Sequence, residues 1–314
     1  MSVFVPPGNH RSNAAAAAAG LRPFYSTREG LRLGQAAGGY LPLVAQDYSN
    51  ATIGGAPEED WRHSEIVESP SFSGNRSARL GRNMALGDPV DPNQCGGSFY
   101  GRRVSMPLVP LGKSVWQRFR VYFPSNFSWG FAYGANESDN PCGRPTDGTS
   151  TSLKFLVFSP NIGTARIYLN LDCPRRQIGQ KANPGIRILM EGGANPIANN
   201  LVIPEDQWVS FQLGIKVSNT GDGWARLWVD DQLLCEGVNI NTVASQATGL
   251  NEWGIGDYWN GVPWTDGGEG REHFYVDDII VAADIDGYGA PTSFDSFGNK
   301  YISPMVSVNQ ISGA

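Results

Sequence analysis

The residues of this chain that are best suited to chemistry are aromatic and basic residues in segments that alternate as β-strands do. In WARLWVDD, at 224–231, Trp224, Arg226 and Trp228 alternate with alanine, leucine and valine, so they share one face of a strand. Aromatic faces stack on the C–H surfaces of sugar rings, and guanidinium groups pair with carboxylates or sulfates. This face therefore carries groups suited to an anionic glycan.

Two other segments show the same pattern. Arg118, Arg120 and Tyr122 alternate in SVWQRFRVYFP, and Arg166, Tyr168 and Asn170 alternate in TARIYLNLD. The candidate carbohydrate-binding residues are Arg120, Lys154, Asn170, Trp224, Arg226 and Trp228. Their convergence requires that all these strands belong to one sheet. Two other interpretations stay open: a face packed against the N-terminal arm or a neighbouring subunit, and a plain solvated sheet face.

The elements that must position these residues are short strands. The 39 glycines and 21 prolines indicate many turns between short strands. A helix is expected only in the alanine stretch at 14–19. Val209, Phe211, Leu213, Ile215 and Val217 form one apolar face, and NTGDG at 219–223 has the composition of a hairpin turn. The sequence predicts an all-β antiparallel sandwich over residues 49–287.

The two ends differ from this central part. The composition of residues 1–48 predicts an extended arm with a short alanine helix. Residues 288–314 are predicted to form a polar C-terminal extension or an edge strand for a neighbour. We expect both to contact other subunits in a homo-oligomer. The N-terminus lacks the pattern of a signal peptide, so the chain is expected to stay in the cytoplasm where it is made or to leave by a route other than secretion.

Charge and composition exclude several classes of partner. The formal net charge is -6, which argues against a general nucleic-acid binder. No apolar run is long enough for a membrane span. The cysteines, at 95, 142, 173 and 235, show no metal-binding spacing, and both disulfides and free thiols stay open. We expect no cofactor, although Asp284 and Asp286 in DIDGYG leave a structural calcium ion as the weaker alternative to a turn.

Three segments carry a family resemblance. They are SVWQRFRVYFPSNFSWG followed by LKFLVF, then QWVSFQLGIKVSNTGDGWARLWVDDQLL, and finally WGIGDYWNG with FYVDDIIVA. Together they resemble the concanavalin A-like lectin and glucanase superfamily, including its polysaccharide-lyase-like jelly rolls. The resemblance covers about 50–287 and implies a jelly roll in which sugars lie on the concave side of one sheet.

The resemblance also implies what an enzyme would need. A lyase uses an arginine or amide to neutralise a uronate carboxylate, and a tyrosine or histidine for proton transfer. Arg118 or Arg166 with Tyr122 or Tyr168 are the candidate catalytic residues, while His63 and His273 are weaker ones. The lyase signatures R-T/S-E-L-R and Q-I-H are absent, and so is the E-x-D-x-x-E spacing that a glucanase uses.

These observations lead to two hypotheses from different classes. The missing export signal, the arm and the absent signatures favour a virion-associated structural protein, a tail or capsid-decorating component of a bacteriophage, whose jelly roll binds surface polysaccharide. It would be made in the host cytoplasm and bind other virion subunits through the arm and the tail. The alternative is a polysaccharide lyase that acts on an acidic, uronate-containing polymer.

Overall fold

The computed structural model describes most of the central sandwich and selected strands outside it. The described residues are 3–5, 31–33, 44–46, 64–72, 75–81, 103–125, 127, 132–133, 151–163, 166–173, 176–177, 185–191, 197–199, 201, 203–260, 273–285 and 292–303. Their secondary structure is all β, as predicted. The alanine stretch expected as a helix lies outside them. Within these ranges no helix is long and apolar enough to cross a membrane.

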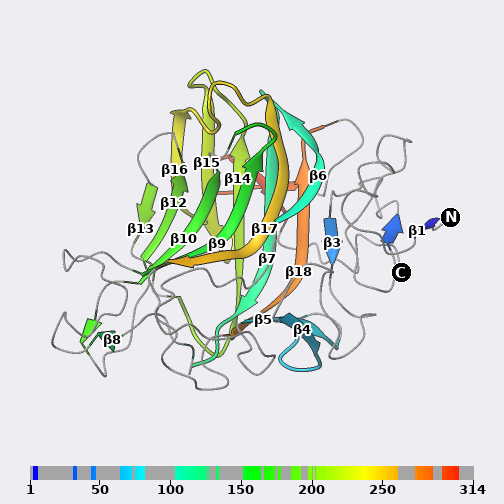
Figure 1. The fold of residues 1–314 in the computed structure, drawn as a ribbon, viewed down its shortest axis with the longest axis vertical. Coiled ribbons are helices and arrows are strands. Elements are labelled where there is room, and N and C mark those ends of the chain that lie inside the picture. The colour runs from blue at the N-terminus through cyan, green and yellow to red at the C-terminus, as the bar shows by residue number, and fades with distance from the viewer. Residues whose placement is uncertain are drawn as a thin grey trace.

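Two large sheets hold most of the described strands, one behind the other (Figure 1). The eight-stranded sheet runs in the order β16 (Gln232–Ile240), β15 (Gly223–Val229), β14 (Trp208–Lys216), β7 (Ser114–Tyr122), β18 (His273–Ala283), β5 (Ser77–Gly81) and β4 (Ser64–Val67), and β3 (Val44–Gln46) also pairs with β18. The six-stranded sheet runs β13 (Ile197–Asn199), β12 (Gly185–Met190), β10 (Ile167–Cys173), β9 (Thr151–Pro160), β17 (Gly249–Asn260) and β6 (Arg103–Pro110).

Three small sheets complete the described strands. β1 (Val3–Val5) pairs with β2 (Leu31–Leu33), β8 (Ala132–Tyr133) pairs in parallel with β11 (Arg176–Gln177), and β19 (Thr292–Phe294) pairs with β20 (Lys300–Ile302). All pairings in the two large sheets are antiparallel. The architecture is the predicted jelly-roll β-sandwich.

The core lies between the two large sheets and follows the predicted alternation. Along β14, Val209, Phe211, Leu213 and Ile215 are almost fully buried, and each faces an inward residue of β7 in the antiparallel register. Aromatic rings fill the centre, where Phe155 of the six-stranded sheet lies 5.2–5.8 Å, centroid to centroid, from the rings of Phe119, Phe123, Phe211 and Phe274. Every second side chain of these strands thus points inward and packs between the two sheets.

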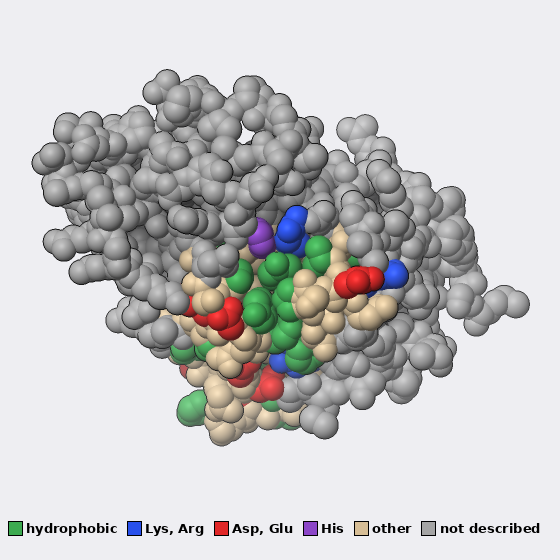
Figure 2. All heavy atoms as spheres, turned by 90° about the horizontal axis from the view of Figure 1, so that it is seen from below, with side chains coloured by type: hydrophobic (Ala, Val, Ile, Leu, Met, Phe, Trp, Pro, Cys, Tyr) green, Lys and Arg blue, Asp and Glu red, His purple; other side chains and the backbone are tan. Residues whose placement is uncertain are grey.

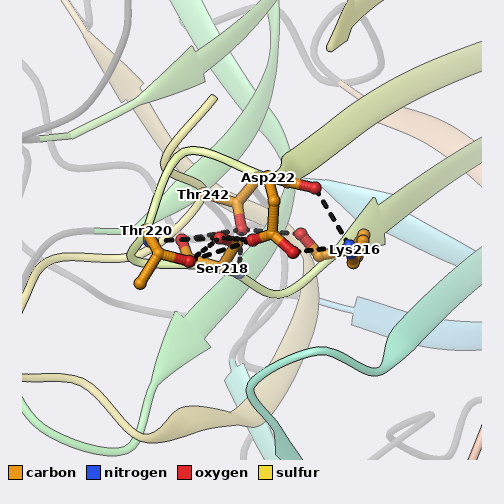
Figure 3. A network of polar contacts seen from close by, with 5 residues as sticks. All are labelled: Lys216, Ser218, Thr220, Asp222 and Thr242. Carbon is orange, nitrogen blue, oxygen red and sulfur yellow. Dashed lines mark hydrogen bonds and ion pairs between the residues drawn. The ribbon is translucent and has the colours of Figure 1, made fainter. Parts of the chain in front are cut away.

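The predicted hairpin turn connects β14 to β15 and is fixed by a polar network (Figure 3). The carboxylate of Asp222 accepts hydrogen bonds from Lys216 Nζ at 2.7 Å, from Ser218 Oγ, and from Thr220 Oγ1 at 3.1 Å. These donors, Lys216 first, lower the pKa of Asp222 well below its ordinary value. Gly221 takes a φ of 86°, a conformation that glycine adopts without strain. The network gives this exposed loop a defined shape.

The C-terminal hairpin of β19 and β20 folds back on the outer face of the eight-stranded sheet. Tyr301 and Ile302 are buried there in one cluster with Trp116, Trp228 and Ile280. This part of the predicted C-terminal extension therefore contacts its own sandwich. The predicted boundaries at 48 and 287, and the expected contacts with other subunits, stay predictions.

Candidate functional site

The candidate residues divide between the two sheets. Arg118, Arg120 and Tyr122 on β7, with Trp224, Arg226 and Trp228 on β15, belong to the eight-stranded sheet; Lys154 on β9, with Tyr168 and Asn170 on β10 and Arg166 just before it, belongs to the six-stranded sheet. The prediction that their strands share one sheet is wrong. The core separates the sheets, so these outward positions lie on opposite sides of the molecule.

The tryptophan face of β15 is closed by the C-terminal hairpin. The indole of Trp228 is 1% exposed, stacks on Tyr301 at a centroid distance of 5.8 Å, and donates from Nε1 to Asp295 Oδ2 at 2.9 Å. Trp116 donates from Nε1 to the carbonyl of Lys300 at 3.1 Å. A ring covered in this way offers no surface to a sugar, so Trp228 is a packing residue in this structure. The expectation that Trp228 lines an open glycan groove is therefore wrong.

Arg118 is also buried beneath the hairpin. Its Nη2 lies 3.0 Å from Asp278 Oδ2, and its Nη1 donates to the carbonyl of Ser303 at 2.6 Å. Burial lowers the pKa of Arg118, and the charge of Asp278 opposes that effect. Asp278 has a φ of 52° and lies within the register shift of β18, between Asp277 and Ile280. The pair joins the sheet, the bulge and the hairpin, and it leaves no room for a substrate carboxylate.

Arg226 and Trp224 lie nearer the rim of the same face. Arg226 Nε is 2.9 Å from Glu236 Oε2, and its guanidinium lies over the Trp224 ring at 4.5 Å from the centroid. Trp224 also contacts Trp116, with ring centroids 6.2 Å apart. These contacts are with residues of the same sheet, and the expected packing of this face against the arm or a neighbouring subunit stays a prediction.

Tyr122 belongs to an aromatic cluster at the other end of this face. Its ring lies 5.7 Å from that of Trp208 and 5.9 Å from that of Tyr275, and Arg120 lies over the ring of Phe72 at 4.5 Å. Figure 2, seen from the side where β4 and β5 lie in Figure 1, shows hydrophobic side chains at the centre of that view with acidic ones beside them. Burial and then Asp206 raise the pKa of Tyr122. A raised pKa makes the phenolate form of Tyr122, the form that would act as a base, harder to reach.

His273 is the histidine candidate that lies within the described residues. Burial, with the charge of Arg79, lowers the pKa of His273 to about 4, so the ring is neutral at pH 7. Its ring packs edge-on against Tyr275 at 5.7 Å. His63 and His10 lie outside the described residues. For the suggested calcium loop, Asp284 Oδ1 pairs with Lys300 Nζ at 2.7 Å, and Asp286 is outside the described residues.

Four residues of different chemical types lie at adjacent register positions across the six-stranded sheet. The backbone register pairs Arg187 on β12 with Asn170 on β10, Asn170 with Lys154 on β9, and Lys154 with Tyr258 on β17. Neighbouring strands lie roughly 4.8 Å apart, so the row spans about 14 Å, enough for more than one sugar ring. Two cations, an amide and a phenol thus occupy adjacent register positions.

Register shifts at this row explain how it forms. Leu169 and Asn170 are consecutive on β10, whereas their partners Leu156 and Lys154 on β9 enclose one extra residue, Phe155. Phe155 and Leu156 are consecutive, and both are buried in the core. With Phe155 as the extra residue, Lys154 pairs with Asn170 in the backbone register. β17 adds one more residue between Ile255 and Tyr258. Bulges of this kind bend a strand and occur next to active sites, and β17 bends strongly in Figure 1.

Within the described residues, the side chain of Arg187 can be placed relative to the core. Ile186 and Ile188 are buried in the core, so Arg187 between them points to the other side, where it is partly exposed. In the next row Tyr168 pairs with Leu189. Tyr168 is fully buried, and its hydroxyl accepts a hydrogen bond from Arg166 Nη1 at 3.1 Å. Arg166 and Tyr168 thus form a fixed pair beside the row.

Sequence reasoning included Lys154 and Asn170 but missed Arg187 and Tyr258. Arg187 could have been found, because GIRILM places one arginine between two isoleucines that alternate with it. Tyr258 was hidden, because the added residue in β17 interrupts the alternation of WGIGDYWN. No cluster of three potential metal ligands from His, Cys, Asp and Glu occurs in the described part of the chain.

Comparison with known proteins assigns the family. The sequence profile described as polysaccharide lyase matches residues 47–280, and the chain belongs to this family. A search of curated proteins gave no match. The main hypothesis of a virion structural protein is therefore corrected in favour of the lyase alternative.

Solved structures with a similar fold include several lyases. An endo-beta-1,4-glucuronan lyase from the fungus Trichoderma reesei is 14% identical, with 76% of this chain and 93% of that chain covered and a TM-score of 0.44. The alginate lyase Aly36B is 13% identical, with 76% and 95% covered and a TM-score of 0.44. The alginate lyase vAL-1 from a Chlorella virus is 11% identical, with 76% and 98% covered and a TM-score of 0.39. These values describe a likeness of fold and nothing finer.

Proposed function

We propose that this protein is a polysaccharide lyase that cleaves a uronate-containing polymer on the outer side of its six-stranded sheet. The row Arg187, Asn170, Lys154 and Tyr258 carries the proposal, because it aligns cations, an amide and a phenol across four adjacent strands. The cations stand out in a chain with a net charge of -6. They suit a substrate that carries carboxylates.

The roles follow from the chemistry of elimination. Arg187, Asn170 and Lys154 neutralise the uronate carboxylate, which stabilises the negative charge that develops when the C5 proton leaves. The C5–H electron pair forms a C4=C5 double bond while the C4–O bond breaks, and the leaving oxygen takes up a proton. We assign both proton transfers to Tyr258, the phenol of the row: its phenolate form takes the proton from C5 and, as the phenol, returns it to the leaving oxygen. No metal or organic cofactor is needed to balance these steps.

The test is the appearance of the unsaturated uronate product. Wild-type protein is mixed with alginate, glucuronan and other acidic polysaccharides, and the ultraviolet absorbance of the conjugated double bond is followed. Tyr258→Phe should lose about a hundredfold or more of the activity, since it removes the proton-transfer group. Arg187→Ala should also lose activity, chiefly in the elimination step. A neutral glucan should give no signal with any variant.

Two substitutions on the eight-stranded sheet are the matched controls. Tyr122→Phe and Arg226→Ala repeat the same chemical changes on the opposite side of the molecule and should retain full activity. A flat absorbance trace for wild type over the whole acidic panel would refute the proposed function. Full activity in Tyr258→Phe, with loss in Tyr122→Phe, would move the site to the other sheet.

The remaining expectations are separate from this proposal. Contacts with other subunits through the arm and the tail, a homo-oligomeric state, the location of the protein and the absence of a cofactor stay predictions. Binding of polysaccharide, which was expected for the β15 face, is proposed here for the six-stranded sheet.

A further inference from the structure

A glutamine stands in the middle of the apolar core. Gln117 on β7 is fully buried, and its register partners on both neighbouring strands are the buried Leu213 and Val281. Its Oε1 has no hydrogen-bond partner among the described residues. A buried polar atom without a partner costs about 1–3 kcal/mol relative to a satisfied one. Such a residue calls for an explanation beyond packing.

The other end of the amide reaches the opposite sheet. Gln117 Nε2 donates to the backbone carbonyl of Gly254 on β17, at 3.4 Å. Gly254 lies directly before the stretch in which the register of β17 shifts, between Ile255 and Tyr258. The hydrogen bond therefore joins the centre of the eight-stranded sheet to the part of β17 that leads to Tyr258.

A directional contact is useful at this point of the strand. Apolar packing is non-directional, and a bulge interrupts the ladder hydrogen bonds that otherwise fix a register. A register error of one residue would turn the following positions to the other face. An amide that holds the Gly254 carbonyl limits such an error and keeps Tyr258 opposite Lys154.

We infer that Gln117 is a positioning residue, which fixes the irregular part of β17 from across the core and so aligns Tyr258 with the row. The effect on catalysis rests on the proposed function. The effect on β17 does not, because it concerns the backbone alone.

The first experiment measures hydrogen exchange in Gln117→Met, which keeps an unbranched side chain of similar size and removes the amide. The backbone amides of residues 254–260 should exchange about tenfold faster than in wild type, a local opening of the kind that exchange detects. Those of 208–216 on β14 should not change. Leu213→Met is the matched control, since it places methionine in the same core layer and should leave 254–260 unchanged.

Gln117→Asn is the second variant, because it keeps an amide that is too short to reach Gly254. It should loosen 254–260 as Gln117→Met does. Unchanged exchange at 254–260 in both variants would overturn the inference, and so would an increase spread evenly over both sheets. Either result is independent of lyase activity.

Kinetics then test the catalytic consequence. In Gln117→Met, kcat should fall about tenfold with KM little changed, because the substrate-binding positions lie on β9, β10 and β12 while Tyr258 lies on β17. The limb of the pH–rate profile that reports the proton-transfer group should shift, whereas in Leu213→Met it should not. A wild type without lyase activity would refute the proposed function and leave the exchange result to decide the role of Gln117.

Discussion

The ring of Trp228 lies almost parallel to that of Tyr301, with an interplanar angle of 16° and centroids 5.8 Å apart. Trp228 belongs to β15 of the sandwich, and Tyr301 belongs to the C-terminal hairpin. This contact converts a strand face that resembles a sugar platform into a packing surface. It also makes the hairpin part of the folded domain, which leads to the first prediction.

Tyr301→Ala should destabilise the protein without affecting its activity. Tyr301 is 6% exposed, and truncating a buried aromatic residue costs about 3–5 kcal/mol. Urea unfolding followed by tryptophan fluorescence measures the loss, and the absorbance assay measures activity below the transition. Phe297→Ala in the same hairpin is the control, since Phe297 is 75% exposed and should change stability little. Equal stability of the two variants would show that the hairpin is not held by this stack.

The buried pair of Arg118 and Asp278 should be costly to break. Arg118→Met removes a buried cation that lies 3.0 Å from the carboxylate of Asp278, and breaking a buried ion pair by removing one partner costs about 3–5 kcal/mol. Adding Asp278→Asn should recover part of the loss, since asparagine removes the charge and tolerates the φ of 52°. The measurement is the free energy of unfolding for the single and the double variant.

The partly exposed ion pair of Arg226 and Glu236 is the comparison for the buried pair of Arg118 and Asp278. Arg226→Met breaks the partly exposed pair with Glu236 and should cost at most about 1 kcal/mol. If Arg118→Met proves no more destabilising than Arg226→Met, the assignment of Arg118 to a structural pair is wrong.

His273 should make stability depend on pH below neutrality. Its pKa is lowered from 6.5 to about 4 in the folded state by burial and Arg79, so the folded protein favours the neutral ring. The resulting stabilisation is complete above about pH 6.5 and is lost as the pH falls toward 4, because the unfolded state takes up the proton first. Unfolding curves from pH 4 to 7.5 for wild type and His273→Gln measure this difference. The two slopes should differ only in that interval; equal slopes would contradict the pKa of the ring.

The sequence predicted the core better than it predicted the site. Alternation along β14 predicted that Val209, Phe211 and Leu213 face inward, because period two holds wherever a strand has one buried face. Alternation along β7 likewise predicted that Arg118 shares one strand face with Arg120 and Tyr122. It could not reveal that Asp278, 160 positions away, and the C-terminal hairpin enclose Arg118.

The division of the candidates between two sheets had a different cause. Strand pairing between distant segments depends on register and topology, so alternation alone did not separate Arg166 from Arg226. Tyr258 was not predicted from the sequence, because the residue added in β17 interrupts the period-two alternation of the strand. Irregular strands are thus where a functional residue is hardest to recognise from pattern.

The extra residues in β9 and β17 also affect how relatives should be compared with this chain. The segment between two aligned register positions is Leu169–Asn170 on β10, Lys154–Leu156 on β9 and Ile255–Tyr258 on β17, so it grows by one residue from each strand to the next. An alignment that keeps these strands free of gaps will equate Tyr258 with a neighbour in any homologue that lacks one of the insertions. Equivalent residues are found by counting across the ladder rather than along the chain.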